Sequence, residues 1–258
     1  MILPVTNRVL KTAVLATIFL TVFAGNALAN QVTISRVAGY YAGVGGEFSI
    51  TAVDADAIAA ITNTVLPNYD ASTQGIAGLL SFQTFCIEYS EHVSPPETDN
   101  YDVNSSGAVG GGVGGNPDPL SVGTEYLYQA FATGGLVGYY DYNPGVDRQN
   151  SAAMLQEAFW YLEEEIDLAN PLSNVFLNLV DTNIVGGLAF AKANTDTGNL
   201  YDVFALNLTD LNGNNRQSQL VYGDLTTITT SSVPDGGLTL MMLGAGLSGL
   251  AMLRRKLS

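Results

Sequence analysis

The pattern of hydrophobic and polar positions divides the middle of the chain into three kinds of segment: strands, helices and a glycine-rich loop. Short β-branched or aromatic runs bounded by Gly, Asn or Asp predict strands at Gln31–Val37, Glu47–Val53, Leu79–Tyr89, Tyr201–Thr209 and Gln217–Gly223. Helical spacing predicts helices at Gly123–Thr133, Asp147–Glu165 and Leu172–Ala193, the last kinked near Gly186 and Gly187. The glycine-rich stretch Asn104–Pro119 predicts a flexible loop. This order predicts an α+β body, a β-sandwich or barrel-like structure with a helical insertion.

Two charge-free apolar runs flank this body. Near the N-terminus, Arg8 and Lys11 precede the run Ala13–Ala24, which leads into Ala27-Leu28-Ala29. A basic region, a short apolar region and an Ala-x-Ala triplet predict a secretory signal peptide over residues 1–29, cleaved after Ala29. A retained N-terminal anchor is the alternative.

The C-terminal run follows a helix-breaking segment, Val233-Pro234-Asp235-Gly236-Gly237. Residues 237–253 carry no charge and predict a single transmembrane helix, short for a bilayer, which ends at Arg254-Arg255-Lys256. Basic residues stay on the cytoplasmic side, so the body, residues 30–232, is expected outside. A buried core helix is the alternative, but three adjacent cations at its end are unusual.

The tail, residues 233–258, resembles the PEP-CTERM sorting signal of Gram-negative envelope proteins, in the variant where Val-Pro-Asp replaces Val-Pro-Glu-Pro. The resemblance covers a tenth of the chain and rests on the order of motif, apolar helix and basic cluster. It implies recognition by an exosortase-type membrane enzyme and cleavage near Val233–Gly237. The expected location is the cell envelope, membrane-anchored before sorting, and afterwards the cell surface or the extracellular space.

Charge excludes one class of partner. Of the 24 Asp and Glu residues, all but Asp235 lie in the body, which has only four Lys and Arg, so its formal net charge is −19. Such a body repels nucleic acid phosphates and anionic lipid, and we expect no nucleic acid partner.

The body contains one cysteine, Cys86, which cannot form an intrachain disulfide. In the helix Asp147–Glu165, a buried stripe is predicted at Ala152, Leu155, Phe159 and Leu162, and Gln156 lies beside it. A carboxamide in such a place needs a partner. A hydrogen bond to backbone satisfies it, and Cys86 is then an ordinary buried cysteine; a covalent bond is the alternative.

Phe85-Cys86-Ile87-Glu88 and Leu155-Gln156-Glu157-Ala158-Phe159-Trp160 resemble the paired signatures of bacterial thioester domains, which are surface-adhesin modules. In that family the cysteine and the glutamine join as an internal thioester. Leu155 stands where the family usually has Thr, and Phe159 where it has Ile.

The resemblance implies that the Cys86 thiolate attacks the side-chain carbonyl of Gln156 and ammonia leaves, giving an acyl donor for a partner amine. Phe85, Phe159 and Trp160 are expected to wall the site against water. His92, six residues after Cys86, is a candidate base, although a lone loop histidine more often faces solvent. This is single-turnover covalent binding, and we predict no turnover enzyme.

Two stretches, around Asn194–Gly198 and Asp210–Asn214, have oxygen-bearing side chains at alternate positions, as calcium loops do, but they also fit ordinary turns. No other cofactor is expected. Two functions remain open. The first is a covalent adhesin or matrix cross-linker that targets an amine on a surface or matrix protein. The second is a non-covalent structural or carbohydrate-binding envelope protein that meets exopolysaccharide through tyrosines such as Tyr139, Tyr140 and Tyr142.

Overall fold

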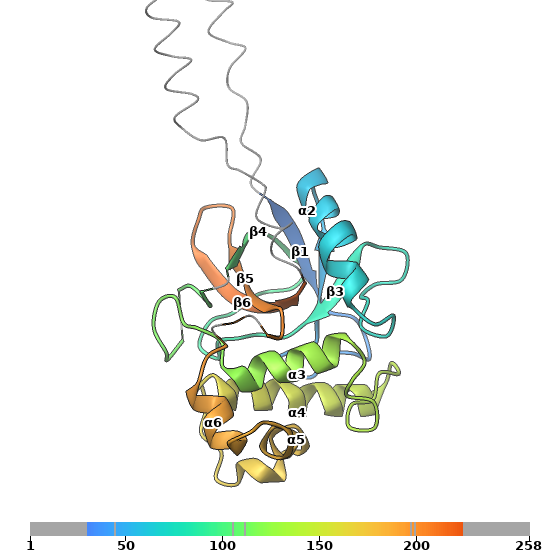
Figure 1. Cartoon of the computed structure of the whole chain (residues 1–258). Coiled ribbons are helices and arrows are strands. Elements are labelled where there is room, and N and C mark those ends of the chain that lie inside the picture. Colours follow the sequence, from blue (N-terminus) through green and yellow to red (C-terminus); the bar gives the residue numbers. More distant parts are fainter. Residues whose placement is uncertain are drawn as a thin grey trace, which may run out of the picture. The chain divides into compact units, whose positions relative to one another are not determined.

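A computed structural model of the chain describes residues 30–223, except positions 44, 105, 111, 197 and 199 (Figure 1). The described residues belong to one compact unit. The described strands form a six-stranded sheet in the order β3-β2-β1-β4-β5-β6, and every neighbouring pair is antiparallel. Their bounds are Gln31–Ser35 for β1, Phe48–Ala52 for β2, Ser81–Thr84 for β3, Glu97–Asn104 for β4, Val203–Thr209 for β5 and Asn215–Tyr222 for β6.

The sheet curls until its two edge strands meet. Beyond β3 the chain stays extended and runs antiparallel to β6, where Cys86 lies opposite Gln219. Ile87 N donates to Ser218 O and Leu220 N donates to Phe85 O, both at 3.0 Å. These bonds satisfy backbone groups that an open sheet would leave free at both edges, and the result is a half-barrel.

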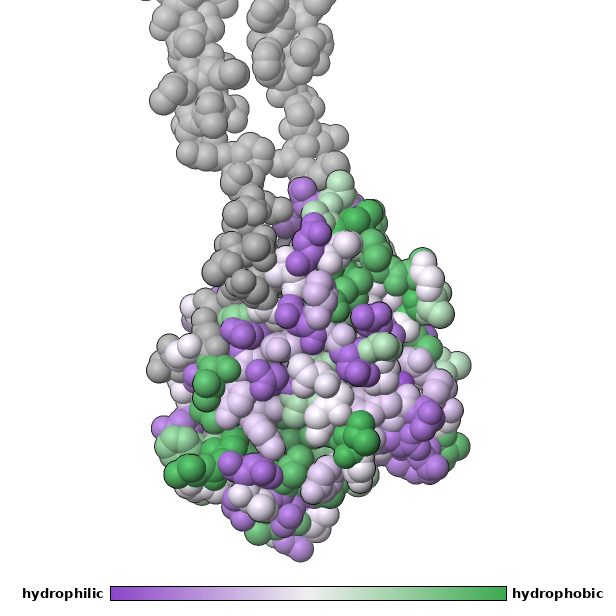
Figure 2. Space-filling model, turned by 45° about the vertical axis from the view of Figure 1, so that its right-hand side comes forward, coloured by the Kyte–Doolittle hydropathy of each residue, from purple (hydrophilic) through white to green (hydrophobic). Residues whose placement is uncertain are grey.

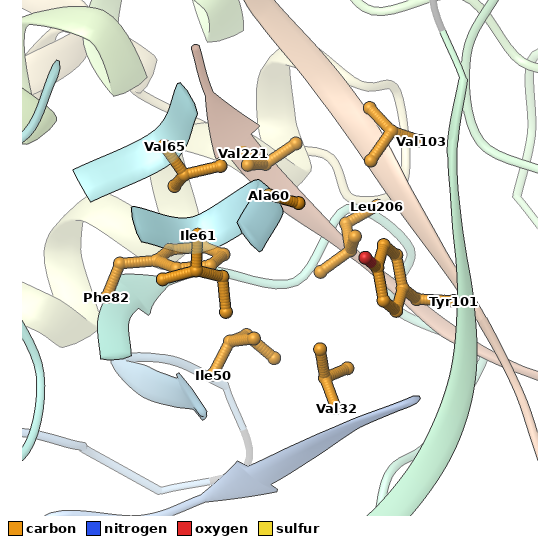
Figure 3. Close-up of a pocket in the computed structure, with 10 residues that line it drawn as sticks. All are labelled: Val32, Ile50, Ala60, Ile61, Val65, Phe82, Tyr101, Val103, Leu206 and Val221. Carbon is orange, nitrogen blue, oxygen red and sulfur yellow. The ribbon is translucent and has the colours of Figure 1, made fainter. Parts of the chain in front are cut away.

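The concave side of the half-barrel is a dry core. A small cavity there is lined by apolar side chains from all six strands and from the segment that covers it (Figure 3), namely Val32, Ile50, Phe82, Tyr101, Val103, Leu206, Val221, Ala60, Ile61 and Val65. Helix α2, Ala55–Ala60, and the one-turn π-helix Ile61–Val65 form this cover. The free volume of about 20 Å³ suits little more than one water molecule. This cavity therefore has no room for an organic ligand.

The remaining α-helices lie between β4 and β5 in the sequence and form a layer beside the sheet, in which α3 packs against β5 and β6 (Figure 1). They are α3, Val122–Ala132; α4, Val146–Leu162; α5, Val175–Asn183; and α6, Gly187–Ala193. Phe85 joins the two layers, because its ring centroid lies 5.0 Å from that of Phe131 on α3 and 5.3 Å from that of Phe159 on α4. The chain segment that carries Cys86 is thus fixed against the helices.

The α+β class and the helical insertion are confirmed. Each of the five predicted strands is present, and the predicted kink at Gly186 and Gly187 is the break between α5 and α6. The sandwich alternative is wrong, because the described strands form one curled sheet. Strand β4 was not predicted, and neither was helix α2 with the short helical turns that follow it. The acidic, Asn-rich sequence of β4 has little strand propensity, but hydrogen bonds to β1 and β5 hold it in the sheet.

The predicted signal peptide, residues 1–29, and the sorting segment with its transmembrane helix, residues 233–258, lie outside the described residues. Among the helices of residues 30–223, none is by itself long and apolar enough to cross a membrane. Helices α5 and α6 reach that length and hydropathy only as a pair, which is bent by 94°.

Candidate functional site

Gln156 and Cys86 meet in the buried layer between α4 and the sheet seam, which is the place where residues 85–87 pair with β6. Gln156 Nε2 donates to the carbonyl oxygen of Cys86 at 2.8 Å, and the amide nitrogen of Cys86 donates to Gln156 Oε1 at 3.0 Å. Gln156 is 1% exposed and Cys86 is fully buried. The carboxamide therefore pairs with the backbone of Cys86 much as a neighbouring strand would.

The helix brings Gln156 to this place through its buried stripe. Ala152, Leu155, Phe159 and Leu162 are all buried, as their spacing predicts, and Gln156 projects from the edge of the same face. The amide is held in the sheet seam because β6 occupies only the other side of Cys86. A strand residue directs its N–H and C=O to one side, so those of Cys86 are left for Gln156.

A third backbone group completes the hold on the amide. Gly46 N donates to Gln156 Oε1 at 2.9 Å. Only glycine fits at positions 45 and 46, because a Cβ on Gly45 would lie 2.3 Å from Gln156 Cγ, and one on Gly46 would lie 2.5 Å from Phe85 Cδ1. The glycines let the backbone of the loop before β2 approach the amide closely.

This geometry resembles a preformed oxyanion hole. Two backbone N–H groups, from Gly46 and Cys86, point at the same oxygen at 2.9 and 3.0 Å, the distances at which such donors stabilise a developing negative charge. The side chain of Cys86 stands out of the plane of the sheet that holds the amide, since strand side chains are perpendicular to the hydrogen-bonding direction.

The thiol itself is held in its protonated form. Burial raises the pKa of Cys86 well above the ordinary range of a thiol, and the nearby Glu88 carboxyl adds to the shift. Gln219 Nε2 lies 3.8 Å from Cys86 Sγ and acts in the opposite direction. Burial also raises the pKa of Glu88 to about 7. One of its oxygens accepts from Ser218 N at 2.8 Å, and the other has no hydrogen-bond partner among the described residues. Glu88, two residues after Cys86, is therefore a buried carboxyl that can exchange a proton near neutral pH.

Phe85, Phe159 and Trp160 lie around the amide as expected. Phe85 and Phe159 are fully buried and Trp160 is 8% exposed. Trp160 also packs edge-on against the half-exposed ring of Tyr89, with centroids 4.9 Å apart. A Cβ on Gly45 would lie 2.8 Å from the Trp160 ring, so this indole and the glycine backbone together cover Gln156 on its solvent side.

An ion pair next to the site was not foreseen from the sequence. Arg148 and Glu47 are 1% and 0% exposed, and they form a two-point contact, Nε to Oε2 at 2.9 Å and Nη2 to Oε1 at 2.5 Å. The available signal was the position of Arg148 four residues before Ala152, on the apolar stripe of α4, where a cation needs a buried acid.

The other candidate residues are not brought to the site in the same way. His92 is exposed and forms no hydrogen bond or ion pair with the described residues, so its role as base stays a prediction. Of the three tyrosines expected to meet sugars, only Tyr139 is exposed; Tyr140 is buried and Tyr142 is half-buried. Tyr140 donates to Glu47 and Tyr142 donates to Phe131 O, so both hydroxyls make hydrogen bonds inside the protein.

The stretches considered for calcium form turns. The Asp210 carboxylate accepts from Asn212 N and Asn214 N, at 2.8 and 2.9 Å, inside the β5–β6 hairpin. Asp196 likewise accepts from Gly198 N at 3.0 Å. Within the described part of the chain, no group of three or more His, Cys, Asp or Glu side chains is arranged to hold a metal ion.

Comparison with known families gave a match to the VPDSG-CTERM motif at residues 232–257. The chain has Val233-Pro234-Asp235-Gly236-Gly237, so Gly236 stands where the motif's name has Ser. The match supports a PEP-CTERM-type sorting signal, and with it export and processing by an exosortase-type enzyme at the cell envelope. Comparison with curated proteins and with solved structures gave no significant match.

Proposed function

We propose that the exported body is a covalent binding module in which Cys86 and Gln156 form an internal thioester that acylates a partner amine. The observation that carries this proposal is the three-point hold on the Gln156 carboxamide by Gly46 N–H, Cys86 N–H and Cys86 C=O. Two of these groups would stabilise the oxyanion that forms when a sulfur attacks the amide carbon. The sorting signal supports this role, because a signal of this type would bring the module to the cell envelope, where it could meet a partner.

The chemistry balances without a cofactor. Cys86 Sγ bonds to Gln156 Cδ, the Cδ–Nε2 bond breaks, and the thiol proton leaves with Nε2 as part of ammonia. In the second step a neutral amine of the partner attacks Cδ, the C–S bond breaks, and Cys86 regains a proton. The partner is then joined to Gln156 by an amide bond. Burial among Phe85, Phe159 and Trp160 would slow competing hydrolysis.

Intact mass tests the first step. The wild-type chain is expected to be lighter than its sequence mass, after allowance for processing, by one ammonia, and Cys86→Ala and Gln156→Ala are expected to lack this loss. Incubation with methylamine should add one methylamine to the wild type and release a thiol that alkylates after unfolding. A wild-type chain of full mass, with a thiol that alkylates after unfolding without prior amine treatment, would rule out the thioester.

A non-covalent envelope role is favoured by a different observation at the same residues. The hydrogen bonds between Gln156 and the Cys86 backbone also satisfy every polar atom they join, which a purely structural glutamine would require. Such a protein would keep its full mass and a protonated buried thiol. The same mass measurement therefore separates the two functions.

A further inference from the structure

The loop before β2 is tied to helix α4 at two adjacent residues. Gly46 N–H contacts Gln156, and the next residue, Glu47, forms the buried ion pair with Arg148. Gln156 and Arg148 are on the same helix, eight residues or about two turns apart. The loop thus meets α4 at both ends of this interval, once through a backbone donor and once through a charged side chain.

The ion pair is enclosed on every side. Arg148 Nη2 donates to Ser72 O at 3.1 Å, Nη1 donates to Tyr142 O, and the guanidinium lies 3.6 Å from the centroid of the Tyr40 ring. Tyr140 donates to Glu47 Oε2 at 2.5 Å. Burial raises the pKa of the Glu47 carboxyl, while Arg148 and Tyr140 lower it. Arg148 Nη2 donates to both Glu47 and Ser72, and Glu47 Oε2 accepts from both Arg148 and Tyr140, so these contacts fix the orientation of both side chains.

A buried ion pair of this kind contributes little net stability to a fold. Apolar residues of the same volume often stabilise a core as well or better, because charges lose their hydration on burial. Its advantage over apolar packing is direction, since a guanidinium fork and a carboxylate fix both distance and orientation. The Arg148 fork fixes Glu47, which directly follows Gly46. Gly45 and Gly46 have no side chains that could fix the loop themselves.

We infer that Glu47, Arg148 and Tyr140 are positioning residues that hold the Gly46 N–H on the Gln156 carbonyl oxygen for thioester formation. This inference rests on the proposed function. Gly46 N–H is the catalytic donor, because it contacts the reacting carbonyl, and the buried pair acts through it. Misplacement of an oxyanion donor by about 1 Å is enough to slow a reaction by about 100-fold.

The rate of ammonia loss after refolding tests this role in the full-length chain. The chain is recovered unfolded from inclusion bodies in denaturant, so that Gln156 still carries its amide. Refolding is started by dilution of the denaturant, and the mass is followed over time. The variants are Arg148→Lys, which keeps the charge but loses the two-point fork, and Tyr140→Phe, which removes one hydroxyl. A third variant, Glu47→Leu with Arg148→Met, removes both charges together. Arg216→Gln, which breaks the partly exposed contact with Asp210 at 3.6 Å, is the matched control.

We expect ammonia loss to slow by tenfold or more in Arg148→Lys and in the double variant, and by a smaller factor in Tyr140→Phe, at temperatures well below each variant's Tm. Arg216→Gln should match the wild type. Native-like circular dichroism with a slowed rate supports positioning, because a merely structural role would lower Tm and leave the rate of the folded protein unchanged.

The outcomes separate the two claims. A wild type that never loses ammonia overturns the proposed function and this inference with it. A wild type that loses ammonia, alongside folded variants that lose it equally fast, overturns the inference alone. If the double variant does not fold, Tyr140→Phe and Arg148→Lys carry the test.

Discussion

The carboxamide of Gln156 and the backbone of Cys86 exchange two hydrogen bonds, at 3.0 and 2.8 Å, across 70 residues of sequence. The contact joins the middle of α4 to the seam where the sheet closes on itself. It places an amide carbonyl, two N–H donors and a buried thiol in one small volume.

Replacing Gln156 by Leu should lower the free energy of unfolding by about 3 kcal/mol, because Gly46 N–H, Cys86 N–H and Cys86 C=O lose their partner inside the core. Urea unfolding followed by circular dichroism measures this. Gln149→Leu, on the same helix and with one half-buried hydrogen bond to Tyr41 O, is the control and should cost about 1 kcal/mol or less. Equal losses in the two variants would contradict the three-point hold.

Gly45→Ala should displace Gln156. The added Cβ would lie 2.3 Å from Gln156 Cγ and 2.8 Å from the Trp160 ring, a clash that costs about 1–3 kcal/mol and moves the amide. We expect a lower Tm together with loss of the ammonia-deficient mass. Gly198→Ala, whose nearest neighbour would be Asp196 Oδ1 at 3.6 Å, has ordinary contact distances and should leave both unchanged. A normal Tm and mass in Gly45→Ala would show that the loop yields without effect.

The body should be more stable at pH 4.5 than at pH 8, the reverse of the usual trend. Burial raises the pKa of Glu88 and of Glu163 from 4.5 to about 7, so the folded state keeps protons that the unfolded state releases between these values. The stability of such a group is fully present below pH 4.5 and is lost as the pH rises through 7, by up to about 3 kcal/mol for each.

Thermal unfolding at several pH values measures this trend, and the variants Glu88→Gln and Glu163→Gln should each flatten it. Asp210 contributes in the opposite direction, because Asn214 and Asn212 lower its pKa to about 2. Both this value and the ordinary value of 3.8 lie below pH 4, so the effect of Asp210 is confined to pH values below about 4. A Tm that climbs steadily from pH 4.5 to 8 would show that Glu88 and Glu163 ionise normally.

Deleting residues 233–258 should move the body from the membrane fraction to the periplasm or the medium, because the motif matched at residues 232–257 is then lost. Cell fractionation and immunoblotting measure the distribution. A chain that lacks residues 224–231 but keeps the tail is the control and should stay with the envelope. Unchanged retention after removal of the tail would place the sorting information elsewhere.

The sequence predicted those parts of the molecule in which local pattern and burial agree. The stripe on α4 follows helical spacing, so Gln156 was correctly placed beside it, and Cys86 was correctly expected in a buried strand-like segment. Strand β4 was missed because its Asp and Asn residues argue against a strand, and only its two neighbours make it one. Glu47 and Gly46 were missed for a related reason. Their roles depend on contacts with α4 about 100 residues away, which no local pattern encodes.

The strand that packs beside Cys86, β6, is the last of the described strands to be synthesised. Gln219 is 133 residues further along the chain and belongs to β6, the final described strand. Contacts so distant in sequence form late in folding. If the chain is exported unfolded, as the predicted signal peptide implies, it crosses the membrane before this niche is assembled. The proposed chemistry would then begin only after translocation, and the reactive bond would not be exposed to the amines of the cytosol.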